Sequence, residues 1–272
     1  MPTWILLLAV LGASLAGCAG APPQQTAARG LPKVYDVREL LDAVTARQRT
    51  DRTAMLQVAG HVEDGTRASG EPAMTVGGTG ALRIEDFGVS VDFTQTLTHS
   101  GEAPQSTGFV VLPGQVFLRL PSAQPGDPRP WTKVDAASGD AAERTLATLA
   151  TNVVDSADPT ANISRFADAS LVADASDDPV DGTPAVRYTI VVDLNRAAEL
   201  ERDPGVRAQL QQQVAGGLTR ISSTLWVDAE SRPVRSEARQ DMPGIGTLAM
   251  TADYRSWGTP VLITPPPAGQ VR

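Results

Sequence analysis

Apolar residues first recur at helical spacing just after residue 36. The stripe comprises Val37, Leu40, Leu41 and Val44. Asp36 precedes it and Glu39 follows three residues later, which is the arrangement of a helix N-cap with a capping-box acid. The pattern predicts an amphipathic helix over residues 37–49.

Five segments after this helix alternate between apolar and polar residues or form short apolar runs, and turn residues bound several of them. They are 54–62, 80–86, 88–97, 108–113 and 116–121. Their spacing predicts a meandering antiparallel sheet. The glycine-rich stretch 76–81 is interpreted as a turn, and 122–131, with three prolines, as an exposed loop.

The middle of the chain returns to helical periodicity. One stripe comprises Leu146, Leu149, Ala150 and Val153, and a second comprises Ile163, Phe166, Ala167 and Leu171. Asp140 caps the first helix, and Asp203 with Pro204 begins a further one. The segment 177–194, a turn followed by a strong strand, lies between them. Three strands close the chain, at 219–228, 233–242 and 246–257.

This order of elements predicts an α+β fold, in which helices pack on one face of a single large antiparallel sheet. Alternate strand residues point to the same face and form a candidate apolar wall. The wall comprises Leu56, Val58, Leu82, Ile84, Val91, Phe93, Val116, Leu118, Tyr188, Ile190, Leu225, Val227, Leu248 and Met250. A core filled by helices and a cavity filled by ligand have the same sequence pattern, so both interpretations remain open here.

The amino terminus carries a separate signal. The run from Thr3 to Cys18 has no charged residue, and the first charge in the chain is Arg29. Such a run is short for a membrane span and is typical of a secretory signal. The residues Leu15-Ala16-Gly17-Cys18 match a bacterial lipobox, in which the cysteine thiol is acylated and the peptide is cut before it.

These signals divide the chain into four parts. Residues 1–17 are the expected signal peptide, and 18–32 the lipidated Cys18 with a flexible tether. A single domain follows over 33–265, and 266–272 form a proline-led tail. The lipid anchor places the domain at the outer, extracytoplasmic face of a cell membrane.

Composition narrows the partners. The chain of 272 residues holds 23 basic and 31 acidic residues, for a net charge of −8, which argues against nucleic acid. Cys18 is the only cysteine, so an intrachain disulfide is excluded. With 42% apolar residues the chain can build a sizeable core.

Signatures of an enzyme are absent from the sequence. The two histidines, His61 and His99, lie in a predicted strand and a polar loop, and no zinc-protease, nucleophile-elbow or phosphate-loop motif occurs. The acidic run 174–181 lacks the spacing and closing glutamate of a calcium loop. We therefore predict a protein that is not an enzyme and that uses neither a metal nor another cofactor.

Several segments together resemble one family. They are the lipobox, the 37–50 helix, the strand 182–194, the hairpin 223–241 and the stretch 253–266. Over roughly residues 34–264 the chain resembles the LppX/LprG/LprA lipoproteins of actinobacteria, which are related in fold to the lipoprotein carrier LolA. The resemblance implies a strongly curved sheet, a half-barrel with helices on its concave face, enclosing an apolar cavity for acyl chains.

The expected function follows from the anchor and the resemblance. A membrane-anchored lipoprotein would bind lipids or lipoglycans by their acyl chains and carry them across the cell envelope, with an envelope transporter as a possible partner. The alternative is an envelope sensor or protein-interaction module of the same fold without lipid cargo, because fold alone does not determine function.

Overall fold

The computed structural model describes residues 30–63, 72–121, 126–135, 137–138, 140–242 and 246–272. The chain divides into two units, Met1–Gly30 and Leu31–Arg272, and the second contains every helix and strand described below. The expected signal peptide and Cys18 lie outside the described residues. No helix in the described part of the chain is long and apolar enough to cross a membrane.

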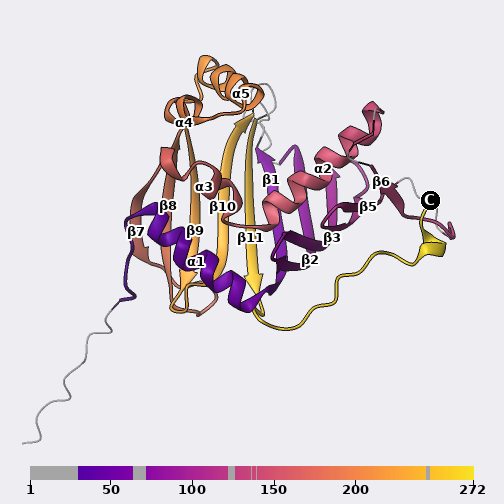
Figure 1. The fold of residues 1–272 in the computed structure, drawn as a ribbon, viewed down its shortest axis with the longest axis horizontal. Helices are drawn as coiled ribbons and strands as arrows, with labels where there is room; N and C mark the ends of the chain where they lie inside the picture. Colours follow the sequence, from indigo (N-terminus) through magenta and orange to yellow (C-terminus); the bar gives the residue numbers. More distant parts are fainter. Residues whose placement is uncertain (1–29, 64–71, 122–125, 136, 139, 243–245) are drawn as a thin grey trace, which may run out of the picture. The chain divides into compact units, whose positions relative to one another are not determined.

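The second unit is built on one sheet of 11 strands in the order β6-β5-β4-β3-β2-β1-β11-β10-β9-β8-β7 (Figure 1). All neighbouring strands are antiparallel, and β6 and β7 are the two edges, so the sheet is open. The first six strands are β1 (Thr53–Glu63), β2 (Met74–Glu85), β3 (Gly88–His99), β4 (Gln105–Leu112), β5 (Gln115–Arg119) and β6 (Thr132–Val134). The last five are β7 (Ser170–Asp177), β8 (Ala185–Asp193), β9 (Arg220–Asp228), β10 (Pro233–Met242) and β11 (Gly246–Arg255).

Two meanders make up this sheet, and the pairing of β1 with β11 joins them. Met55 lies opposite Arg255, so residues 200 positions apart in the sequence become neighbours in the middle of the sheet. This pairing turns two hairpin series into one continuous surface.

The helices are α1 (Val37–Asp51), α2 (Ala141–Ala157), α3 (Ala161–Arg165), α4 (Leu194–Leu200) and α5 (Pro204–Ala215), with 3-10 turns at Ala167–Ala169 and Ala268–Gln270. Aspartates begin four of them, because a carboxylate accepts hydrogen bonds from the free N–H groups of the first turn. These caps are Asp36, Asp140, Asp193 and Asp203. The helices α1, α2 and α3 pack against one face of the sheet, here called the inner face, whereas α4 and α5 pack on each other at the ends of β8 and β9 (Figure 1).

The α+β class predicted from the sequence, with one large antiparallel sheet and helices on one face, is confirmed. Three local predictions are wrong. The glycine-rich stretch 76–81 is the middle of β2 and not a turn. Leu171, expected in a helical stripe, lies on β7 with 55% of its surface exposed. Leu149 is 38% exposed, because α2 faces the sheet with alanines, whose small side chains allow close approach.

The carboxy-terminal segment covers part of the opposite, outer face. Ile263 packs there with Val110 of β4 and Phe117 of β5. The last residues then reach the sheet edge, where the N–H of Trp131 donates to the Gln270 carbonyl and the N–H of Arg272 donates to the Trp131 carbonyl. The residues that the sequence assigned to a tail therefore extend the hydrogen bonding beside β6, as the parallel bridge between Trp131 and Val271 shows.

Candidate functional site

The strand register places all 14 candidate wall residues on the inner face. Across the middle of the sheet, Leu56 faces Gly80, which faces Phe93, which faces Phe109. On the other side, Leu56 faces Tyr254. The same side continues through Phe109 to Leu118 of β5, and through Ala252, Ser236 and Leu225 to Tyr188 of β8, and alternation along each strand places the remaining candidates.

These residues fall into two packed clusters. The first lies between α2 and strands β1–β6; of the candidates it holds Leu56, Val58, Leu82, Val91, Phe93 and Leu118, with Ile84, Val116 and Met250 at its margin. The second lies beneath α1 and α3 and holds Tyr188, Ile190, Leu225 and Val227. Leu248 is half-buried and belongs to neither cluster. Most of the predicted wall is therefore in contact with helices.

A part of the inner face extends from the margin of the first cluster to the strand ends farther from α1. We call it the apolar tract; it comprises Val62, Met74, Val76, Leu97, Leu248 and Met250. In the register, Val62 lies between Met74 and Leu248, and Val76 faces Leu97. Val62 and Val76 are buried, and the other four are half-buried. The tract is a continuous aliphatic surface made by β3, β2, β1 and β11.

Sequence reasoning identified only Leu248 and Met250 of this tract. The signal for Met74 and Val76 was present in the alternation that precedes residue 80, but the glycines beside it favoured a turn. Leu97 and Val62 stood at the ends of predicted strands, and no pattern within one strand could show that they neighbour Leu248.

Glycines of β1 and β2 are explained by the large side chains that lie across them. A Cβ added at Gly78 would overlap the Phe93 ring, and one added at Gly60 would overlap the sulfur of Met250. At Gly80 the added atom would meet the Asp92 carbonyl and the Phe93 backbone. The strand keeps its glycines because the inner face is crowded at these points.

Replacing Gly80 by Ala is expected to lower the free energy of unfolding by about 1–3 kcal/mol, because the new methyl meets backbone atoms that cannot rotate away. Gly77→Ala is the matched control, since an added Cβ there has nothing within 4 Å. Denaturant unfolding of both variants measures the difference. Equal losses at the two positions would contradict the packing described here.

The inner face contains a buried hydroxyl pair near its centre. Tyr254 is 2% exposed, and its phenol oxygen lies 3.4 Å from Oγ of Ser236. Burial raises the pKa of Tyr254 well above its ordinary value, and the hydrogen bond with Ser236 only partly offsets this. The pair stays neutral, so it is compatible with an apolar surrounding and is unsuited to proton transfer near neutral pH.

An ion-pair cluster fastens α1 to the sheet. Asp51, at the end of α1, accepts hydrogen bonds from Arg47 and from Nε of Arg232, both at 2.8 Å. Its side chain is 8% exposed. Arg232 lies in the turn between β9 and β10, where its N–H donates to Asp228. These ion pairs therefore hold α1 over the apolar residues of the second packed cluster.

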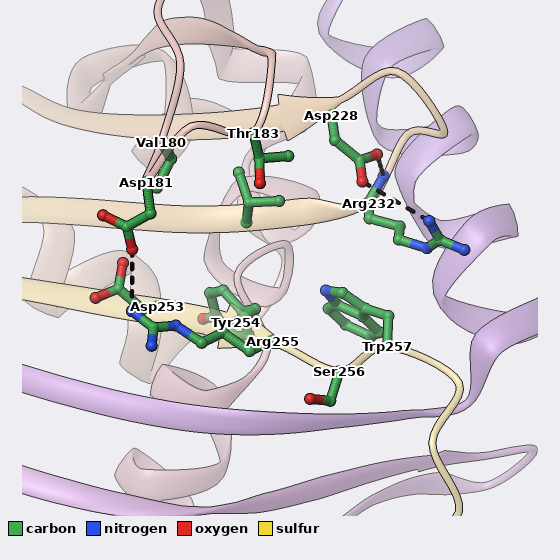
Figure 2. A pocket seen from close by; sticks show the side chains of 11 residues that line it. Val180, Asp181, Thr183, Asp228, Arg232, Asp253, Tyr254, Arg255, Ser256 and Trp257 are labelled. Carbon is green, nitrogen blue, oxygen red and sulfur yellow. Dashed lines mark hydrogen bonds and ion pairs between the residues drawn. The ribbon is translucent and has the colours of Figure 1, made fainter.

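A pocket of about 500 Å³ lies beside the β9–β10 turn and the end of β11, and Figure 2 shows it from close by. Arg255 donates to Asp181 across the pocket at 3.0 Å, and Trp257 stacks near Tyr254. Arg235 likewise donates to Asp253 at 2.6 Å. Because its charged side chains pair with one another, we assign this pocket a structural role.

The two histidines do not form a site together. His61 lies on the outer face of β1 and contacts Glu63 at 3.1 Å, whereas His99 is exposed at the end of β3. Among the residues that the structure describes, no group of three His, Cys, Asp or Glu side chains is placed to hold a metal ion. The prediction that the protein is not an enzyme stays a prediction.

Comparison with known proteins adds little to this geometry. No family model matches the chain, and no curated protein matches it. Among solved structures, the chain is similar to a LolA superfamily protein from Nitrosomonas europaea, with 10% identity over 82% of this chain and 93% of that chain and a TM-score of 0.26. At that TM-score the likeness carries no conclusion about function. The finer resemblance to the LppX/LprG/LprA lipoproteins stays a prediction.

Proposed function

We propose that this protein is a lipid-anchored, extracytoplasmic lipoprotein that binds acyl chains of lipids or lipoglycans on the inner face of its sheet and carries them through the cell envelope. The observation that carries the proposal is the apolar tract. Four of its six side chains are half-buried, although they lie on the same face as a tightly packed core.

Aliphatic side chains in this arrangement suit an acyl chain better than a polar ligand. Each methylene moved from water to apolar surroundings contributes roughly 0.8 kcal/mol to binding. The tract crosses four neighbouring strands, β3, β2, β1 and β11, which is about 14 Å at the usual spacing of strands and gives room for several methylenes. Met250, on this path, has an unbranched side chain that can adapt to different ligand shapes.

The identity of the ligand is tested by extraction. The protein is purified from its native host, extracted with organic solvent, and the extract analysed by mass spectrometry against an extract of an unrelated lipoprotein from the same membranes. We expect lipid in an amount comparable to the protein. A lipid-free protein recovered in a stable complex with another protein would instead support a sensor or interaction module.

The membrane anchor is tested at Cys18. Replacing it by Ala is expected to release the protein from membranes or leave its precursor uncleaved, because acyl chains on this thiol are the proposed anchor. Membrane fractionation and the mass of the protein report the two outcomes. A Cys18→Ala protein that is still membrane-bound and correctly cleaved would refute the lipobox interpretation.

A further inference from the structure

One turn of the sheet presents an aromatic side chain to solvent. Phe87 lies between β2 and β3 and is 93% exposed, the highest value among the large apolar side chains of the described residues. Gly88, which follows it, has φ of +144°, a conformation that favours glycine and that allows a tight turn. No contact within the fold explains a phenylalanine at this position.

Basic side chains stand beside this turn. Arg49 is exposed in the last turn of α1, and Arg52 follows the helix with its guanidinium 3.6 Å from Asp86. The carbonyl of Arg52 also accepts the N–H of Ile84, which ties the end of α1 to the hairpin. Both arginines line a recess of about 590 Å³ between α1 and the turn. The lining also holds three acids: Asp86 pairs with Arg52, Glu85 accepts hydrogen bonds from Arg83 and Ser90, and Asp158 accepts one from Thr160.

The turn also lies at the end of the strands near which the folded chain begins. Leu31 donates its N–H to Asp177 at the end of β7, and Lys33 pairs with the same carboxylate at 2.7 Å. The antiparallel register puts the end of β7, the β9–β10 turn and the β2–β3 turn at the same end of the strands (Figure 1). Thirteen residues, 18–30, precede Leu31, and they can span at most about 45 Å. An anchor on Cys18 therefore keeps this end of the strands within reach of the bilayer.

We infer that the β2–β3 turn docks on the membrane surface, with Phe87 inserted among the acyl chains and Arg49 and Arg52 against anionic phospholipid headgroups. An exposed aromatic side chain with arginines on a neighbouring element is a combination that favours binding at a membrane interface. Docking would hold the acylated domain with this end of its strands toward the bilayer from which lipid is taken. The inference rests on the membrane attachment in the proposed function.

The unique cysteine makes a direct test possible. In the acylated protein Cys18 is blocked, so Phe87→Cys provides a single thiol for an environment-sensitive fluorescent probe. The full lipidated chain, with acylation checked by mass, is placed in vesicles of phosphatidylcholine and phosphatidylglycerol that contain a lipid-borne quencher. Ser100→Cys is the control, because it lies in the exposed turn between β3 and β4 at the opposite end of the strands. We expect at least about threefold stronger quenching at residue 87 than at residue 100. Equal quenching at the two positions would overturn docking through this turn.

The contribution of Phe87 itself is measured from a neighbouring position. Pro113 lies in the exposed β4–β5 turn, at the same end of the strands as Phe87. A probe on Pro113→Cys is compared with and without Phe87→Ser. Quenching should fall at least about twofold when the phenyl ring is removed, and further when phosphatidylglycerol is omitted. Quenching that is unchanged by both would overturn the inference. A protein that docks through residue 87 but yields no lipid on extraction would refute lipid carriage alone.

Discussion

Met250→Trp is expected to weaken binding of a diacyl lipid by roughly tenfold and to lower the stability of the lipid-free protein less than the same enlargement in the filled core does. Met250 is half-buried where the apolar tract meets the margin of the first packed cluster, so the indole would take space that the ligand needs. Excluding about two methylenes from the site costs roughly 1.6 kcal/mol, which corresponds to about a tenfold change in affinity. Binding of a fluorescent diacyl lipid and thermal unfolding of the lipid-stripped protein measure the two effects.

Leu225→Trp is the matched control because the same enlargement falls in a filled part of the same face. Leu225 is 1% exposed and lies in the second packed cluster beneath α1. Overpacking there is expected to lower the free energy of unfolding by about 1–3 kcal/mol. The contrast between the two variants separates a ligand surface from a core. Severe destabilisation by both, or unaltered lipid uptake by Met250→Trp, would count against the tract as a binding surface.

Asp51→Asn is expected to destabilise the protein by about 1–3 kcal/mol. The carboxylate is 8% exposed and accepts from two arginines, and an amide in its place would turn a donor toward at least one of them. Glu199→Gln is the control, because the pair of Glu199 with Arg196 is more than half exposed on both sides and should contribute little. Urea unfolding at neutral pH compares the variants; equal losses would contradict a special role for the Asp51 cluster.

The same carboxylate predicts a pH dependence. Burial favours the neutral acid, but hydrogen bonds from Arg47 and Arg232 outweigh it and hold the pKa of Asp51 below its ordinary value of 3.8. A carboxyl with a depressed folded-state pKa contributes its full stability above the unfolded-state pKa and loses it as the pH falls through the folded-state pKa. The stability difference between the wild type and Asp51→Asn should therefore be constant above about pH 5 and shrink at lower pH. A difference that grows on acidification would contradict this assignment.

Local pattern was sufficient for much of the secondary structure. The N-cap at Asp36 and the apolar stripe after it are properties of neighbouring residues, and α1 begins where they predict. The three closing strands likewise follow from alternation and turn residues, and β9, β10 and β11 occupy nearly the predicted ranges. Because side chains alternate with a period of two on any strand, the sequence was also enough to choose which residues of each strand belong together.

Tertiary structure decided how the strands are joined and which part of the shared face is filled. The pairing of β1 with β11 brings Val62 beside Leu248, a contact between distant residues that neither strand's own pattern contains. Gly78 and Gly80 lie in β2 beneath Phe93 of the next strand, a contact that the local glycine-rich pattern does not contain. The sequence shows that residues 266–272 begin with prolines, but their pairing with Trp131 depends on β6 forming an edge of the sheet. Whether an apolar residue of the inner face meets a helix or remains half-buried depends on where the helices lie, and that is set by long-range packing which local periodicity does not encode.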